Sequence, residues 1–193
     1  MPNFLKAEID IITRLKNELS SNLIYHSYFH TLDVMNAAMQ IAESENVSEE
    51  DISLLRVAIA YHDSGFIEVY NGHESKGCEY AKMDLPNLGF SQNQIEKICG
   101  MIMATKIPNK TNNKLEEIIA DADLDYLGRF DYIPISEKLF KELQLNSLIE
   151  NLELWNKVQL EFLTKHQYLT SFSIANRERT KQNNLKAISV VSD

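Results

Sequence analysis

Apolar residues recur at every third or fourth position along most of the chain, which is the pattern of amphipathic α-helices. Because the sequence holds only six Gly and four Pro, it offers little material for turn-rich β architecture. We therefore predict an all-α fold, built as a bundle of helices. The periodic segments predict helices over residues 4–19, 28–43, 48–62, 73–83, 91–104, 114–127, 135–145, 147–166 and 172–188.

Length and charge limit the kind of protein this can be. With 193 residues and 44% hydrophobic content, we expect a single domain over residues 1–193. The formal charge of -9 argues against bulk electrostatic binding to nucleic acid or to an anionic membrane surface. No apolar run approaches the roughly 20 residues that span a bilayer, and the first residues lack the features of a signal peptide. We expect a cytoplasmic protein that binds small ligands, with its last four residues frayed.

The segment Tyr61-His62-Asp63-Ser64-Gly65 places an imidazole and a carboxylate side by side at the end of an apolar run, Leu54–Ala60. Burying both groups is costly unless hydrogen bonds or a cation compensate them. Taken alone, the two residues are better interpreted as a hydrogen-bonded pair at a capped helix end. Their meaning therefore depends on whether similar groups lie elsewhere in the chain.

Two other segments carry such groups. His30 lies at the inner edge of the helix predicted over 28–43, and the segment Asp121-Ala122-Asp123-Leu124-Asp125 contains three carboxylates. Because each segment belongs to a different predicted helix, their side chains can converge only in the core of a helical bundle. Imidazole and carboxylate together suit Mn, Fe, Zn or Mg, with water completing the shell. An ion held in this way lowers the pKa of its bound water to near neutral, and the resulting hydroxide is the nucleophile of many hydrolases.

These motifs resemble those of a known family. The segment Tyr25-His26-Ser27-Tyr28-Phe29-His30-Thr31-Leu32-Asp33-Val34 is similar to the YHNxxHxxDV segment best known from cyclic-nucleotide phosphodiesterases, with Ser27 in place of Asn. The order of His30, then His62-Asp63, then an Asp resembles the signature of the HD-domain metal-dependent phosphohydrolases. This resemblance covers about residues 24–130. It implies an HD-type helical bundle on which the helices of about 135–188 pack.

The resemblance also implies roles for individual residues. Those that match the family's metal ligands are His30, His62, Asp63 and Asp123. His26 matches the position that protonates the leaving oxygen in the phosphodiesterases, a role that suits an imidazole one helical turn from the metal. His26 and Asp63 are therefore the candidate catalytic residues, and the alternative for His26 is a structural role.

The acidic segment offers two candidates for the last ligand. Residues 121–128 resemble the DxDLxxLG segment of small bacterial HD proteins, and alignment of Ala122-Asp123 with the Ala-Asp pair of the superfamily favours Asp123 over Asp121. The two carboxylates face different ways on a helix, so they are not expected to reach one ion together. Binuclear members add histidines after the HD pair, and the corresponding helices here offer only His73. We therefore expect one divalent ion rather than two.

Three further residues are candidates for substrate binding: Glu74, Lys106 and Arg129. The alternative for Glu74 is a solvated acid in the first turn of a helix, and for Lys106 and Arg129 it is an ordinary surface cation. His166 lies far down the chain and is predicted to be structural. The apolar stripe around Trp155 is predicted to be core, and the alternative is a homodimer face.

From these residues and the resemblance we predict a metal-dependent phosphohydrolase, of phosphodiesterase or phosphomonoesterase type. It would use metal-activated water on a nucleotide or other small phosphoester. The alternative within enzymes is hydrolysis of a nucleoside 5′-monophosphate or of a nucleotide pyrophosphate. An alternative of another class is a non-catalytic sensor that binds a metal and a nucleotide.

Overall fold

The computed structural model describes residues 1–191, and no strand occurs in that part of the chain. The fold is all-α, as the periodicity predicts. The 3-10 turns are η1 (Ser64–Ile67), η2 (Leu85–Leu88) and η3 (Asp125–Gly128). The α-helices are α1 (Phe4–Glu18), α2 (Tyr28–Ser44), α3 (Glu49–Tyr61), α4 (His73–Asp84), α5 (Gln92–Ala104), α6 (Lys114–Asp123), α7 (Tyr132–Leu145), α8 (Leu152–Lys165) and α9 (Ser171–Val191).

Polar residues cap several of these helices where the sequence offers them. The Ser48 hydroxyl accepts a hydrogen bond from the backbone N–H of Asp51 at the start of α3. Ser91 and Gln94 form a capping box at the start of α5. Such caps satisfy N–H groups that have no partner within the helix, so the observed bounds of α3 and α5 follow the predicted ones closely.

Four helices differ from their predicted bounds by three residues or more, and among them α7 begins at Tyr132 rather than at residue 135. α6 ends at Asp123 rather than at residue 127, because the chain tightens into η3 and places the Asp125 carboxylate 2.7 Å from Nε of Arg177. α8 begins at Leu152 rather than at residue 147. Ser147 adopts a positive φ of 58°, which is incompatible with a helix interior. α9 extends to Val191, and the last two residues of the predicted frayed end lie outside the described residues.

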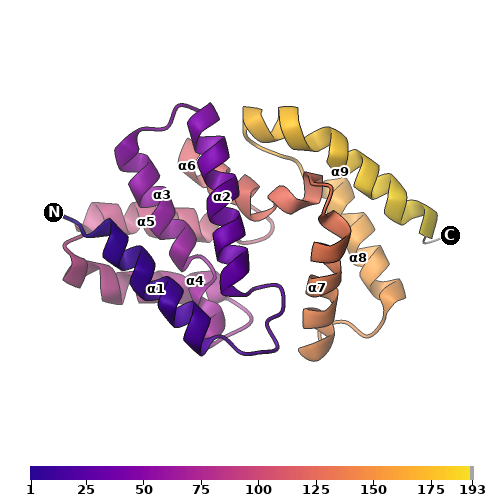
Figure 1. Cartoon of the computed structure of the whole chain (residues 1–193), viewed down its shortest axis with the longest axis horizontal. Coiled ribbons are helices and arrows are strands. Elements are labelled where there is room, and N and C mark those ends of the chain that lie inside the picture. The colour runs from indigo at the N-terminus through magenta and orange to yellow at the C-terminus, as the bar shows by residue number, and fades with distance from the viewer. Residues whose placement is uncertain (192–193) are drawn as a thin grey trace.

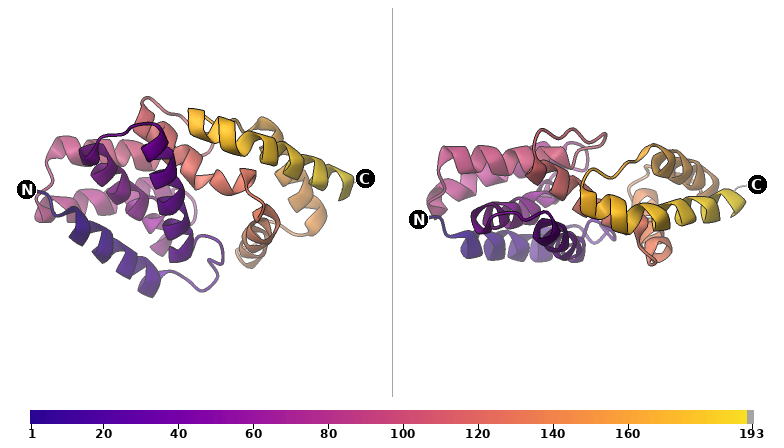
Figure 2. Two further views of the ribbon diagram at one scale, coloured as in Figure 1. Left: turned by 45° about the horizontal axis from the view of Figure 1, so that its top comes forward. Right: turned by 90° about the horizontal axis from the view of Figure 1, so that it is seen from above.

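The helices form two lobes, α1–α6 and α7–α9, with the chain ends at opposite extremes of the molecule (Figures 1 and 2). The larger lobe is organised around α3, whose residues 57–60 are completely buried. Burial on all sides explains why this run is continuously apolar rather than amphipathic. Other members of the same core cluster are Ile11, Ile41, Leu85, Ile98, Ile102 and Ile119.

The smaller lobe has its own apolar cluster, which reaches back to the first lobe through Tyr25 and η3. Trp155 of α8 is buried in this lobe and stacks on Phe140, with the ring centroids 6.0 Å apart. Trp155 therefore agrees with the predicted core role of this stripe, whereas Val158 in the same stripe is 47% exposed. The apolar cluster of the smaller lobe consists of Tyr25, Leu124, Tyr126, Leu127, Tyr132, Leu163 and Ile188.

None of the described helices combines the length and apolar content needed to cross a membrane.

Two glycines allow close packing where the lobes and the site are built. A Cβ on Gly65 would overlap the backbone of His73, so Gly65 lets the start of α4 pack directly against η1. A Cβ on Gly128 would lie 2.5 Å from Cβ of Arg177. Gly128 thus lets α9 approach η3, and both glycines are explained by contact between segments.

Candidate metal centre

Four side chains from different segments converge inside the larger lobe. His30, in the first turn of α2, places Nε2 3.0 Å from Oδ1 of Asp123 at the end of α6. His62, directly after α3, places Nε2 3.2 Å from Oδ2 of Asp63 and 3.6 Å from Oδ1 of Asp123. His30 Nε2 also lies 3.5 Å from Oδ2 of Asp63. The fold therefore brings together the four residues that the sequence assigns to a metal.

The His62 ring is held in one orientation. Its Nδ1–H donates to the carbonyl oxygen of Ile59 at 2.7 Å, so the lone pair of Nε2 faces the cluster. His62 Nε2 and Asp63 Oδ2 are buried, and neither has a hydrogen-bond partner among the described residues. Leaving buried polar atoms unpaired is costly. Both atoms therefore fit a cation bound between them.

The charges of the cluster favour the same conclusion. Burial acts to raise the pKa values of Asp63 and Asp123, but the imidazoles of His62 and His30 outweigh it and hold both pKa values well below the ordinary 3.8. Burial lowers the pKa of His62, yet the two carboxylates raise it well above its ordinary 6.5. The site therefore stabilises positive charge, as protons or as a metal ion that displaces them.

The donor atoms are compatible with a divalent ion. One atom each of His30, His62 and Asp123 lies within 4.8 Å of the others. Two ligands on opposite sides of one ion are about 4 Å apart, so small side-chain movements would bring these atoms into a common shell. Imidazole and carboxylate oxygen suit Zn, Fe, Mn or Mg, and this donor set does not distinguish among them.

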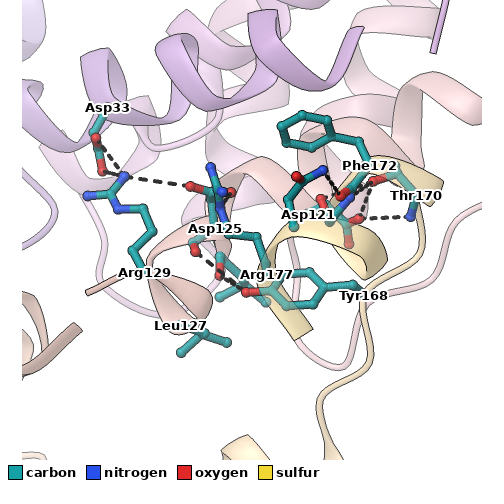
Figure 3. A network of polar contacts seen from close by, with 12 residues as sticks. Asp33, Asp121, Asp125, Leu127, Arg129, Tyr168, Thr170, Phe172 and Arg177 are labelled. Atoms are coloured by element: carbon teal, nitrogen blue, oxygen red, sulfur yellow. Dashed lines mark hydrogen bonds and ion pairs between the residues drawn. The ribbon is translucent and has the colours of Figure 1, made fainter. Parts of the chain in front are cut away.

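The Asp121 carboxylate points to the segment around Thr170 that leads into α9 (Figure 3). The carboxylate accepts hydrogen bonds from the backbone N–H of Leu169 at 3.0 Å and of Thr170 at 2.8 Å, and from the Thr170 hydroxyl at 2.7 Å. Protein groups thus satisfy this buried acid. It holds the segment that leads into α9, and the geometry favours Asp123 over Asp121 as the residue that faces the cluster.

Arg129 is surrounded by acids rather than directed at the cluster. Its guanidinium donates to Asp33 and to Asp131, each at 2.9 Å, and lies 3.7 Å from Asp125. These neighbours raise the pKa of Arg129 further, although burial opposes them. The predicted phosphate-binding residue therefore lies in a network that joins α2 to the segment after η3 (Figure 3).

His26 lies beside the cluster in the loop before α2. Its ring stacks on Phe66, with centroids 4.4 Å apart, and its Nδ1 forms a very short hydrogen bond with Oε1 of Glu142. The other carboxylate oxygen of Glu142 accepts the backbone N–H groups of Tyr25 at 2.8 Å and of His26 at 2.9 Å. The Tyr70 hydroxyl donates to Glu142 at 3.0 Å. The position of His26 is thus set by one fully buried acid.

Glu142 is a site residue that the sequence analysis missed. It belongs to α7, 116 positions after His26, and its exposed fraction is 0%. A signal was present, because Glu142 follows Tyr132, Ser136 and Leu139 at helical spacing along the inner face of α7. An acid on such a face indicates a buried partner.

Glu74 and Lys106 have different relations to the cluster. Glu74 is buried, and its Oε1 lies 3.8 Å from Nε2 of His73. His73 Nε2 in turn lies 3.6 Å from Oδ1 of Asp63, so Glu74 approaches the cluster through His73. Lys106 is exposed in the loop after α5.

His166 lies in the smaller lobe, where it packs against Tyr168 and Lys181. Its ring contacts Tyr168 edge to face at 4.7 Å between centroids. The Lys181 ammonium donates to the His166 carbonyl at 2.6 Å. Burial and this ammonium lower the pKa of His166 to about 4. The imidazole is therefore neutral near pH 7, in agreement with the predicted structural role.

A family model described as "HD domain" matches residues 28–126, just over half of the chain. The chain belongs to the HD domain family. This confirms the resemblance drawn from His30, His62-Asp63 and the acidic segment. The matched region of this HD protein contains all four residues of the cluster, whereas His26 and Glu142 lie outside it.

A solved structure has a similar fold, the crystal structure of a predicted HD superfamily hydrolase from an uncultured Thermotogales bacterium. It is 20% identical to this HD protein, covers 82% of this chain and 92% of its own, and has a TM-score of 0.56. At this identity the likeness shows the fold alone. No curated protein matches the chain.

Proposed function

We propose that this HD protein is a metal-dependent phosphohydrolase that acts on a small phosphoester. The observation that carries the proposal is that His62 Nε2 and Asp63 Oδ2, 3.2 Å apart at the centre of the cluster, are both buried and neither forms a hydrogen bond with the described residues. Membership of the HD family and the fold shared with a predicted HD superfamily hydrolase support it.

The ligands in this proposal are His30, His62, Asp63 and Asp123. When bound, the ion would supply a Lewis acid for the phosphoryl oxygens and would acidify a water molecule. The chain's own contribution is orientation. The Ile59 carbonyl fixes the proton of His62 on Nδ1, and hydrogen bonding of this kind to the far side of a ligand sets its direction and basicity.

His26 is proposed to protonate the leaving oxygen. Glu142 accepts from Nδ1 of His26, which leaves Nε2 to carry the proton that is transferred. Burial lowers the pKa of His26, but the hydrogen bond to Glu142 and the nearby Asp63 raise it above the ordinary 6.5. A fraction of His26 is therefore imidazolium at neutral pH, as a general acid requires.

The proposed function admits more than one class of phosphoester substrate. Both phosphomonoesters and phosphodiesters, nucleotides among them, present a phosphorus atom to the cluster and a leaving oxygen to His26. His73 lies beside Asp63, and Glu74 lies beside His73; we propose that both contact polar groups of the substrate. Arg129 is compensated by acids, so we assign it to the structure rather than to the phosphate.

The test combines metal analysis with a substrate panel. Protein stripped with a chelator should regain one equivalent of Mn, Fe, Zn or Mg, and should then hydrolyse at least one member of a panel of nucleotides and simple phosphoesters. Failure to bind any of these ions would refute the metal centre. Stoichiometric binding, thermal shifts with nucleotides and no hydrolysis across the panel would instead support the sensor alternative.

A further inference from the structure

A cavity of about 330 Å³ lies between the two lobes and reaches the metal centre at His26 and Asp123. Its volume is at the lower end of the range of small-molecule sites, about 300–1,000 Å³. The cavity reaches the place where a leaving group would depart, because His26 is among its lining residues. Half of the lining residues come from α7 and α8 of the smaller lobe, among them Tyr132, Leu139, Trp155 and Phe162, and η3 adds Tyr126 and Leu127.

The wall of this cavity is apolar and almost without charge. Among the described residues that line it there is no lysine or arginine, and His26 is the one basic side chain, so a second phosphate group would find no cation beyond the proposed general acid. Its buried amide, Gln159, already accepts hydrogen bonds from the hydroxyls of Tyr132 at 2.7 Å and of Ser136 at 2.6 Å. A polyhydroxylated or multiply charged group would therefore lose its water without gaining enough partners.

From this wall we infer the class of substrate. We propose that the cavity holds the organic group of a phosphomonoester, and that this group is an uncharged, mainly apolar alcohol or phenol rather than a nucleoside or a polyphosphate. The inference rests on the proposed function. In the reaction, the bond between phosphorus and the bridging oxygen breaks, water supplies the new oxygen on phosphorus, and His26 donates a proton to the departing alcohol.

The residues proposed to bind the metal and many of the residues that line the cavity belong to different parts of the chain. All four proposed ligands lie within the residues matched by the family model, whereas the wall residues from Leu127 onward lie outside it. The smaller lobe would thus select the organic group, and the larger lobe would hold the ion.

The first test compares substrates that differ only in the organic group. Metal-loaded protein should hydrolyse hexyl phosphate and phenyl phosphate with kcat/KM at least about tenfold above glycerol phosphate, because each buried methylene favours binding several-fold. Adenosine 5′-monophosphate and adenosine 5′-diphosphate should be poorer than hexyl phosphate. Preference for either nucleotide or for glycerol phosphate would overturn the inference while leaving the phosphohydrolase proposal in place.

The second test measures occupancy without catalysis. Trp155 is the single Trp of the chain and lines the cavity. Its fluorescence should change on addition of hexylphosphonate, which has no cleavable ester bond, and much less with methylphosphonate. A response to hexylphosphonate without hydrolysis of any ester would sustain the cavity and refute the proposed function. Active protein in which Trp155 does not respond would refute the cavity.

A pair of variants on α7 localises the effect. Leu139 is half-buried and lines the cavity, whereas Leu145, at the end of the same helix, is exposed and does not. Leu139→Phe should raise KM for hexyl phosphate about tenfold or more, because the added ring occupies the cavity. Leu145→Phe should leave it unchanged. If Leu139→Phe is unstable, Leu143→Phe, at another half-buried residue of α7 that lines the cavity, serves in its place. Equal KM values in a folded cavity variant and in Leu145→Phe would overturn the proposal.

Discussion

Asp121 and Asp123 lie two residues apart on α6, yet their surroundings are opposite. Asp121 accepts hydrogen bonds from Leu169 and Thr170 and is satisfied by protein groups alone. Asp123 faces two imidazoles, and the cluster around it contains buried atoms without hydrogen-bond partners. A helix can therefore use one face for architecture and another for a ligand site. The number of protein donors around a buried acid distinguishes the two uses.

The same comparison explains the third acid of the segment. Asp125 lies one turn after Asp121, and its carboxylate is paired with Arg177 of α9. Asp121 and Asp125 both connect the larger lobe to α9, whereas Asp123 between them serves the cluster. The three acids alternate between these two roles because side chains two residues apart on a helix point in different directions.

Replacing Asp123 and Asp121 in turn tests this comparison most directly. Asp123→Ala should abolish metal binding and reduce hydrolysis to the level of stripped protein, since it deletes an anionic ligand. Its melting temperature without metal should fall less than that of Asp121→Ala, because the imidazoles of His30 and His62 lose a partner but no backbone N–H group does. Elemental analysis and thermal denaturation measure the two effects. A stable Asp123→Ala protein that keeps its ion would exclude Asp123 as a ligand.

Asp121→Ala should show the reverse pattern. It strands buried N–H groups at Leu169 and Thr170, so we expect unfolding free energy to fall by about 2–5 kcal/mol. The protein that remains folded should still bind one ion. Denaturant titration and metal analysis are the measurements, and loss of the ion without loss of stability would reverse the assignments of Asp121 and Asp123.

A smaller effect is expected at the partner of His26. Glu142→Gln should reduce kcat by about 10- to 100-fold while metal binding is retained, because it changes the orientation and charge of the group that holds His26. Glu142→Asp should recover part of the rate. If Glu142→Gln lowers only stability and leaves the rate of the folded protein unchanged, Glu142 is a structural residue.

The pH dependence of the same pair gives a further check. The pKa of His26 is raised above 6.5, so activity should fall as pH rises through that higher value, and Glu142→Gln should move the fall to lower pH. Burial opposes ionisation of Glu142, but the hydrogen bond to His26 lowers its pKa below 4.5. Its stabilising effect should be present above pH 4.5 and be lost as pH falls through the lower value.

The smallest effect is expected at Arg129. Arg129→Gln should lower unfolding free energy by about 1 kcal/mol, as expected for a partly exposed ion-pair network, and should leave KM unchanged. Lys97→Gln, at an exposed lysine of α5, is the matched control and should change neither quantity. A KM that rises at least about tenfold in Arg129→Gln at unchanged stability would instead assign Arg129 to phosphate binding, because a higher KM reports the loss of a contact with the bound substrate.

The sequence predicted which four side chains converge, because their spacing is a family signature and they lie at or near the ends of helices that periodicity locates. His30 and His62-Asp63 needed no long-range information beyond that spacing. Glu142 could not be assigned in the same way, because its meaning depends on α7 packing against the loop that holds His26. Arg129 was predicted at the phosphate because it follows the acidic segment, and only the fold reveals that Asp33 and Asp131 compensate it.

The link between His26 and Glu142 has an evolutionary consequence. The proposed ligands belong to one part of the chain, while the residue that positions the proposed acid belongs to α7. Changes in the smaller lobe can therefore alter how readily His26 releases its proton, and which organic group departs with it, without exchanging any ligand. In such an arrangement the reactivity of an old metal site can diversify through mutations that leave its signature intact.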